Sequence, residues 1–332
     1  MKIWLKIIGF ASIAILVIAS AAIFLPTKNL LVLGSFLGNK VSSSLEIDQQ
    51  IVSQPINLAI LGFTGAGNNG AYLTDTMIVA HIDPTINKIV LISVPRDLVV
   101  VGENKTLVKL NGVFWLNNEK NPKIFTQPDF SSIKQQLENI TNLPIHYATI
   151  FDVETVRAMV NGLGGLNVYI SEKVSDPTLA DSTGTGNYFT LEPGWRYLDG
   201  NMVVSLVRSR YAKDGDFSRI KHQQAVLTAL GEKLKDLNFL TDANKLLKIK
   251  EGISGHFASD LSNNQLFTLA TMLAKIPKSN WSFATLSFNG SDPLLYSSNI
   301  ATNTGYAYGL VPKMGMGNYS AIWDYISKLI KA

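Results

Sequence analysis

Seven short apolar runs constrain the fold more than any other feature of this sequence. Each run is rich in β-branched residues and is bounded by Gly, Pro or Asp. The runs cover residues 56–63, 76–83, 88–95, 146–152, 165–170, 202–209 and 281–288. Runs of this length and composition are typical of β-strands. Because they are almost continuously apolar, we expect a sheet that is covered on both faces.

Helical patterns separate and follow these expected strands. They cover residues 131–140, 153–165, 216–237, 262–276 and 319–332. Strands mixed with helices in this way predict an α/β fold in which helices flank the sheet on both faces. The chain of 332 residues is long enough to bury a sizeable core.

An uncharged apolar run covers residues 7–25 near the N-terminus. A helix of about 20 such residues spans a bilayer. Lys2 and Lys6 precede the run, and positive charge favours the cytoplasmic side. We therefore predict a single-pass membrane anchor, with residues 1–6 cytoplasmic and the rest of the chain extracytoplasmic. The alternative is a cleaved signal peptide ending near the small residues 19–21, but the run is longer than such peptides require.

Composition excludes several classes of site. The chain has no Cys, so disulfides, thiol catalysis and Cys-ligated zinc are excluded. Its four His residues show no paired metal-ligand spacing. The net charge of +4 is too small to indicate nucleic-acid binding by itself. The Gly-rich segment 62–72 has neither the Rossmann nor the P-loop spacing.

Three of the six Arg residues fall within residues 206–224, although Lys is the usual cation elsewhere in the chain. Along the strand expected at 202–209, side chains alternate, so Arg208 and Arg210 would point to the same side. A helix expected to begin near residue 216 would add Arg219 and, four residues later, Gln223 on one face.

Guanidinium groups grip phosphate through a planar fork, and a helix N-terminus attracts anions. We therefore expect this segment to bind a phosphate and, with so many donors, a pyrophosphate. The alternative is that Asp214 and Asp216 neutralise the Arg residues in ordinary salt bridges. Cations on one face repel each other unless an anion lies between them, which favours the phosphate interpretation.

Two further charged groups lie at the ends of expected strands. Asp75 precedes the run 76–83, and Arg96 and Asp97 follow the run 88–95. Ligands of open α/β sheets bind outside strand ends. Asp75 has the chemistry to hold a divalent cation or to act as a base. Alternatively, Asp75 caps a turn, and Arg96 and Asp97 form a local ion pair.

Several segments, in this order, resemble the LytR-CpsA-Psr family. They are LTDTM at 73–77, SVPRD at 93–97, VKLNGVFW at 108–115, LEPGWRYLDGNMVVSLVRSRY at 191–211 and DFSRIKHQQ at 216–224. The resemblance runs from about residue 56 to about residue 235 and includes a single N-terminal anchor.

The resemblance implies an extracytoplasmic phosphotransferase with a central mixed β-sheet between helices and an apolar tunnel for a lipid. Such an enzyme moves a glycopolymer from a polyprenyl-pyrophosphate carrier to peptidoglycan through a phosphodiester. The resemblance also implies Mg²⁺ or Mn²⁺ as cofactor. We expect no nucleic-acid partner, because the anchor would place the basic cluster outside the cytoplasm. The same residues would serve a lipid-pyrophosphate phosphatase or a non-catalytic binder of pyrophosphate lipid or anionic glycopolymer.

The resemblance also implies roles for the residues of this chain that occupy the family's motif positions. Asp75 is similar to the family's metal-binding aspartate. The residues similar to its pyrophosphate-binding and catalytic set are Arg96, Arg208, Arg210, Arg219 and Gln223, with Asp75, Arg96 and Arg219 as the catalytic candidates. Asp97, Lys109 and Asp216 fall on motif positions in supporting roles. The family often has Asp where this chain has Thr64, and Arg where it has Leu73.

The expected domain organisation follows from these features. Residues 1–6 are cytoplasmic, 7–25 form the anchor and 26–54 form a polar linker. Residues 55–235 form the catalytic domain. Residues 236–332 carry no motif and form a helical and strand portion packed on that domain.

Overall fold

The computed structural model of the protein describes two compact units. The described residues are 47–63, 72–102, 106–119, 124–180, 188–209, 211, 222, 225–226, 229–230, 232–233, 242–287, 293–302 and 305–331. One unit comprises Ile47–Asp152 and Phe257–Ala332, and we call it the sheet unit. The other comprises Val153–His256, and we call it the central unit.

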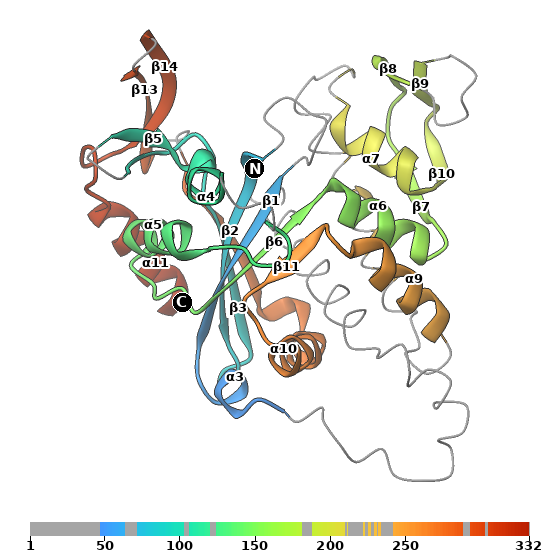
Figure 1. The fold of residues 1–332 in the computed structure, drawn as a ribbon, viewed down its shortest axis with the longest axis horizontal. Helices are drawn as coiled ribbons and strands as arrows, with labels where there is room; N and C mark the ends of the chain where they lie inside the picture. Colours follow the sequence, from blue (N-terminus) through green and yellow to red (C-terminus); the bar gives the residue numbers. More distant parts are fainter. Residues whose placement is uncertain are drawn as a thin grey trace. The chain divides into compact units, whose positions relative to one another are not determined.

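A six-stranded sheet organises the sheet unit (Figure 1). Its strands, in spatial order, are β11 (Phe257–Ser259), β6 (Tyr147–Asp152), β1 (Ile56–Phe63), β2 (Thr74–Asp83), β3 (Lys88–Ser93) and β12 (Trp281–Thr285). β1 is antiparallel to β2 and parallel to β6, while β3 is antiparallel to β2 and parallel to β12. The central mixed sheet is therefore confirmed. Two of its strands, β11 and β12, come from the last hundred residues, where the sequence shows no motif.

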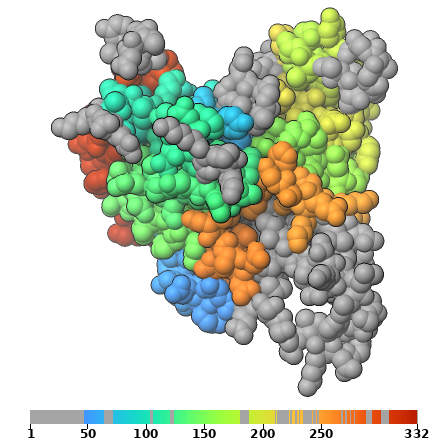
Figure 2. Space-filling model, in the orientation of Figure 1, coloured from blue at the N-terminus to red at the C-terminus, as the bar shows by residue number. Residues whose placement is uncertain are grey.

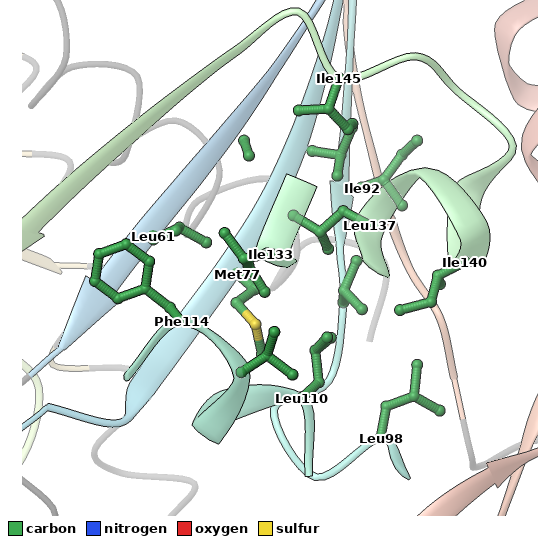
Figure 3. Close-up of a cluster of buried hydrophobic side chains, with 14 of the residues drawn as sticks. Leu61, Met77, Ile92, Leu98, Leu110, Phe114, Ile133, Leu137, Ile140 and Ile145 are labelled. Atoms are coloured by element: carbon green, nitrogen blue, oxygen red, sulfur yellow. The ribbon is translucent and has the colours of Figure 1, made fainter. Parts of the chain in front are cut away.

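Both faces of the central strands are buried, as the continuous apolar runs predict. All eight residues of β1 are buried. The helices α4 (Leu110–Asn118), α5 (Ser131–Thr141) and α11 (Ser320–Lys331) contribute to one core cluster with alternate residues of β1 such as Ala59 and Leu61. Figure 3 shows Leu61 and Met77 of the sheet facing Phe114 of α4 and Ile133 of α5.

Two helices lie away from this cluster. α3 (Gln49–Ser53) and α10 (Asn263–Lys275) contact each other, since the Asp48 backbone N–H donates to Thr268 Oγ1 across 2.9 Å. Figure 1 shows both on the other side of the strands from α5 and α11. A capping box begins α10, because Ser262 and Gln265 bond each other's backbone N–H groups.

Two hairpins complete the sheet unit. β4 (Val99–Val101), the next strand along the chain after β3, pairs with β5 (Leu107–Lys109). β13 (Leu295–Thr302) pairs with β14 (Gly305–Pro312) near the C-terminus. A bridge between Leu98 and Leu310 ties the second hairpin to the first.

The described elements of the central unit include three helices and two small strand pairs. They are α6 (Val153–Gly162), β7 (Leu166–Ile170), β8 (Val174–Ala180), β9 (Tyr188–Leu191), β10 (Gly194–Leu198), α7 (Gly200–Arg208) and α9 (Ala243–Ile253). β7 pairs with β10, and β8 pairs with β9. α6 and α9 approach closely at Gly162, where a Cβ would lie 2.3 Å from Ile249 Cγ1.

The strand expected at 202–209 is wrong, because these residues form most of α7. The helix begins after an N-cap residue, Asp199, which lies before the β-branched run. The Asp199 side chain accepts from the Met202 backbone N–H across 2.8 Å and satisfies one of the donors that a helix start leaves unpaired. Val203, Val204 and Leu206 are buried, so tertiary packing stabilises the helix against the strand preference of its valines.

The predicted membrane anchor lies outside the described residues. Within the described ranges, no helix is long and apolar enough to cross a membrane. The domain boundaries expected from the sequence stay a prediction.

Candidate functional site

The sheet topology brings Asp75 and Arg96 together. β2 and β3 are antiparallel neighbours, so the start of β2 and the end of β3 lie at the same end of the sheet. The Val94 backbone N–H donates to the Met77 carbonyl across 2.9 Å and extends this pairing. Asp75 is the second residue of β2, and Arg96 follows β3. Arg96 Nη1 consequently donates to Asp75 Oδ1 at 2.8 Å.

Asp97 and Lys109 extend this contact into a row of alternating charge. Arg96 Nε lies 3.5 Å from Asp97 Oδ2, and Lys109 Nζ donates to Asp97 Oδ1 at 2.8 Å. The β4–β5 hairpin positions Lys109, because Val99 pairs with Lys109 in its register. We call Asp75, Arg96, Asp97 and Lys109 the charged row. Its two anions and two cations fix one another in place at the end of the sheet.

The electrostatics of the charged row keep Arg96 fully charged. Burial lowers the pKa of Arg96, but the hydrogen bond and charge of Asp75, together with those of Asp97, outweigh burial and raise the pKa above its usual value. About two-fifths of the Arg96 side chain is still exposed, at 43%. The guanidinium is therefore oriented by two carboxylates and reaches solvent, as an anion-binding group requires.

Tyr308 is a member of this site that sequence reasoning missed. Lys109 Nζ lies 5.8 Å from the centroid of the Tyr308 ring, within the range of a cation–π contact. The backbone of β14 is also fixed here, since the Leu310 N–H donates to the Asp97 carbonyl across 2.8 Å. The only signal in the sequence is an aromatic strand, GYAYG at 305–309, and such strands are common in cores and surfaces alike.

Arg208 occupies a different position from the one expected. It lies in the last turn of α7, so the expected pointing of Arg208 and Arg210 to one side of a strand is wrong. A cation at this place also interacts favourably with the helix dipole. Arg208 belongs to the central unit, whereas the charged row belongs to the sheet unit.

The other predicted site residues divide into described and undescribed ones. Arg210, Asp216, Arg219, Gln223 and Thr64 lie outside the described residues. Leu73, where the family often has Arg, lies directly before β2 and is partly exposed. The roles assigned to all of these residues stay predictions.

Of the two carboxylates in the charged row, Asp75 is the better placed to bind a metal ion. Among them, no group of three or more His, Asp or Glu residues could hold a metal ion. Both oxygens of Asp97 face cations, while Asp75 has one oxygen bonded to Arg96 and its side chain is 35% exposed. Mg²⁺ often takes only one or two carboxylates and completes its shell with phosphate oxygens and water. Asp75 fits that mode of binding when a phosphorylated substrate supplies the other ligands.

Comparison with known proteins decides the family. The model of the LytR_cpsA_psr family matches residues 36–312, which is most of the chain. The chain belongs to this LytR-CpsA-Psr family. The resemblance stated from the sequence motifs is thereby confirmed.

Relatives in this family carry transferase names. The chain is 27% identical, over 66% of its length, to a polyisoprenyl-teichoic acid–peptidoglycan teichoic acid transferase TagU of Oceanobacillus iheyensis. It is 23% identical, over 79% of its length, to the corresponding TagV of Bacillus subtilis. These alignments span 63% of the length of each relative.

Solved structures share the fold. The crystal structure of B. subtilis TagV matches with a TM-score of 0.55 at 20% identity, covering 84% of this chain and 98% of TagV. A structure of TagT bound to LIIa-WTA matches with a TM-score of 0.54 at 17% identity, covering 89% of this chain and 97% of TagT. These likenesses support the α/β fold with a central mixed sheet.

Proposed function

We propose that the protein is an extracytoplasmic phosphotransferase that moves a glycopolymer from a polyprenyl-pyrophosphate carrier to peptidoglycan. The observation that carries this proposal is the Asp75–Arg96 contact at the end of the central sheet, in a chain of the LytR-CpsA-Psr family. Relatives named as transferases of teichoic acid to peptidoglycan support the same reaction class.

In the proposed reaction, a hydroxyl oxygen of the acceptor forms a new bond to the phosphorus next to the glycopolymer. The bond from that phosphorus to the bridging oxygen breaks, and the carrier leaves as polyprenyl phosphate. The hydroxyl proton passes to a base, for which Asp75 is the described candidate. Phosphoryl transfer gains mainly from positioning and charge stabilisation, so it needs no covalent enzyme intermediate.

Arg96 would bind the pyrophosphate oxygens through its exposed N–H groups. Asp97 would hold Arg96 in place and would itself be held by Lys109, whose ammonium Tyr308 covers. Asp75 would hold Mg²⁺ or Mn²⁺, which neutralises charge on the pyrophosphate when bound. Arg208, Arg210, Arg219 and Gln223 would complete the pyrophosphate site, with Asp216 in a supporting role.

The proposed location is the cell membrane, with the folded part outside. It rests on the apolar run at 7–25 and on the two lysines before it. Protease added to intact cells should digest the folded part, whereas a tag at the N-terminus should be protected. The reverse pattern of protection would refute this topology.

One assay separates the possible activities. The full chain in detergent is given a polyprenyl-pyrophosphate glycan, peptidoglycan and Mg²⁺, and products are followed by mass spectrometry. We expect glycan joined to peptidoglycan through a phosphodiester, together with polyprenyl phosphate. Hydrolysis products alone would indicate a phosphatase. Tight donor binding without turnover at any Mg²⁺ or Mn²⁺ concentration would indicate a binding protein.

A further inference from the structure

The exposed face of the β7–β10 pair carries aromatic side chains that no core covers. Side chains alternate along both strands, so Tyr169 and Asn167 of β7 face outward with Trp195 and Tyr197 of β10. The antiparallel register places Trp195 opposite Tyr169 and Tyr197 opposite Asn167. Trp195 is 70% exposed, Tyr197 64% and Tyr169 54%. Exposed large aromatics gathered on one face mark an interaction site more often than isolated ones do.

These rings are held in place before any ligand arrives. The Tyr197 hydroxyl donates to the Gly164 carbonyl across 2.6 Å. Its ring lies over Gly165, where a Cβ would come within 2.4 Å of the ring. Tyr169 and Trp195 pack edge to face, with their centroids 5.5 Å apart. A rigid aromatic surface binds with little loss of side-chain freedom.

The backbone beneath the rings is also fixed. Arg196 turns back so that Nε and Nη2 donate to the carbonyls of Glu192 and Pro193, at 2.9 and 2.8 Å. These bonds fix the turn that leads into β10 and therefore hold the backbone at Trp195 in place. The segment carrying β7 to β10 is the yellow-green surface in Figure 2, where its atoms are at the outside of the molecule.

A pocket of about 440 Å³ lies against this aromatic face. Four further residues, each of them helical, also line it: Ala225, Ala229, Glu232 and Lys233. These residues recur at the spacing of one helix face. The two alanines have small side chains, and Glu232 and Lys233 add polar groups to the lining. The volume is within the range of pockets that bind small ligands.

The chemistry of the pocket fits a neutral sugar chain. Aromatic faces carry partial negative charge and attract the C–H face of a pyranose ring. Asn167, Glu232 and Lys233 supply donors and acceptors for hydroxyl and acetamido groups. Among its described lining residues, one acid and one base cancel each other's charge, so these residues supply no basic excess of the kind that an anionic polymer or an anionic lipid surface requires.

We infer that the pocket lined by β7, β10 and the residues Ala225, Ala229, Glu232 and Lys233 binds a neutral N-acetylhexosamine oligosaccharide, with Trp195 and Tyr169 stacked on its sugar rings. This inference rests on the proposed function, in which the glycan strand of peptidoglycan is the acceptor. All the residues that line the pocket belong to the central unit, whereas the charged row belongs to the sheet unit. The pocket would hold the strand, while the chemistry takes place elsewhere.

Titration calorimetry of the full chain with tetra-N-acetylchitotetraose tests the inference. We expect the wild type to bind and Trp195→Ala and Tyr169→Ala to bind at least about tenfold more weakly, because each loses a stacking surface. Tyr188→Ala is the matched control, since Tyr188 is 62% exposed on β9 and does not line the pocket. It should bind as the wild type does. Trp195→Phe should retain most of the affinity while losing the part of the fluorescence change that Trp195 reports.

The outcomes distinguish this inference from the proposed function. Arg96→Ala should lose transfer and still bind the oligosaccharide. If the wild type binds through Trp195 but transfers nothing, the pocket stands and the proposed function fails. Absence of binding, or equal binding by wild type and Trp195→Ala, would refute the inference. So would a Trp195→Ala variant that loses affinity for phosphatidylglycerol vesicles but keeps its affinity for the oligosaccharide.

Discussion

Arg96 donates to Asp75 across 2.8 Å, although 20 residues of sequence and a complete hairpin turn separate the two. This contact joins the two strand ends that sequence reasoning marked as ligand-binding positions. It makes the guanidinium and the carboxylate one unit, so each side chain sets the orientation of the other. Three of the predictions below concern that unit and its neighbours.

Removing the Arg96 guanidinium should slow transfer. We expect Arg96→Ala to lower kcat/KM by about 10²–10³-fold, equivalent to about 2.7–4 kcal/mol, as for loss of one preorganised donor to a developing charge. The kcat/KM of Arg96→Lys should lie between those of the wild type and Arg96→Ala, because Lys keeps the charge but lacks the planar fork. Lys173→Ala is the control, since Lys173 forms an exposed pair with Glu192 that includes no residue of the charged row. Unchanged turnover in Arg96→Ala would refute the proposed role of Arg96 in binding the pyrophosphate.

Replacing Asp75 should weaken metal binding. Asp75→Asn keeps the shape of the side chain but removes the charge that a divalent cation needs. We expect Mg²⁺ affinity, measured by calorimetry on the full chain with a pyrophosphate compound present, to fall at least about tenfold. Asp97→Asn should change it less, because Lys109 and Arg96 already engage both Asp97 oxygens. Equal Mg²⁺ affinity in Asp75→Asn and wild type would assign the metal to other residues.

Tyr308 should support the site through its ring rather than through its hydroxyl. The contact with Lys109 is partly exposed, where a cation–π interaction contributes about 0.5–1 kcal/mol. We therefore expect Tyr308→Ala to lower kcat/KM roughly two- to fivefold and Tyr308→Phe to leave it unchanged. Tyr296→Ala, on the neighbouring strand β13, is the control, because Tyr296 is equally exposed at 46%. A loss in Tyr308→Phe as large as in Tyr308→Ala would contradict this role.

Two histidines should make the fold less stable at low pH. Burial is the main cause that lowers the pKa of His81 and of His146, and nearby Lys88 and Lys134 lower them further. Both rings contact Asn57 through Nδ1: His81 at 2.7 Å from Asn57 Oδ1, and His146 accepting from the Asn57 backbone N–H at 3.0 Å. Protonation of His146 at Nδ1 would remove that hydrogen bond.

Because both pKa values are lowered in the folded state, the stability of the fold should decrease at low pH. The unfolded chain takes up protons first, near pH 6.5, so this contribution to stability is complete above that pH. It is lost as the pH falls from about 6.5 toward the lower pKa values of the folded state. Urea unfolding between pH 8 and pH 5 should show this loss. The loss should be smaller in His81→Asn and His146→Asn, because the Asn side chain does not titrate in this range. A pH dependence equal to that of the wild type would contradict the assignment.

Two adjacent glycines offer a matched test of the aromatic face. Gly164 and Gly165 both have positive φ, at 77° and 82°, so Ala is strained at either. A Cβ at Gly164 meets nothing within 4 Å, whereas at Gly165 it would strike the Tyr197 ring. Thermal unfolding should show that Gly165→Ala lowers stability more than Gly164→Ala, which we expect to cost about 1 kcal/mol. Adding Tyr197→Ala should remove most of the difference, and a difference that persists would contradict the clash.

Local periodicity was sufficient for the central strands. The runs at 56–63 and 88–95 correspond to β1 and β3, and the pattern at 131–140 corresponds to α5. These segments are buried on both faces or have one clear apolar side, so their composition and their environment agree. The prediction of a strand at 202–209 is wrong. Valine-rich sequence favours strands, but a cap at Asp199 and burial of the valines favour α7.

Sequence by itself determined the kinds of residue available and much of the sheet. Asp75, Arg96 and Asp97 were identified at the ends of expected strands, and Lys109 from its position in a family motif. Only the tertiary structure decided that these four form one row, because their contacts depend on strand order and register. It alone added Tyr308 and the Trp195 pocket, since an exposed aromatic and a buried one look alike in sequence, and only packing decides which side chains reach solvent.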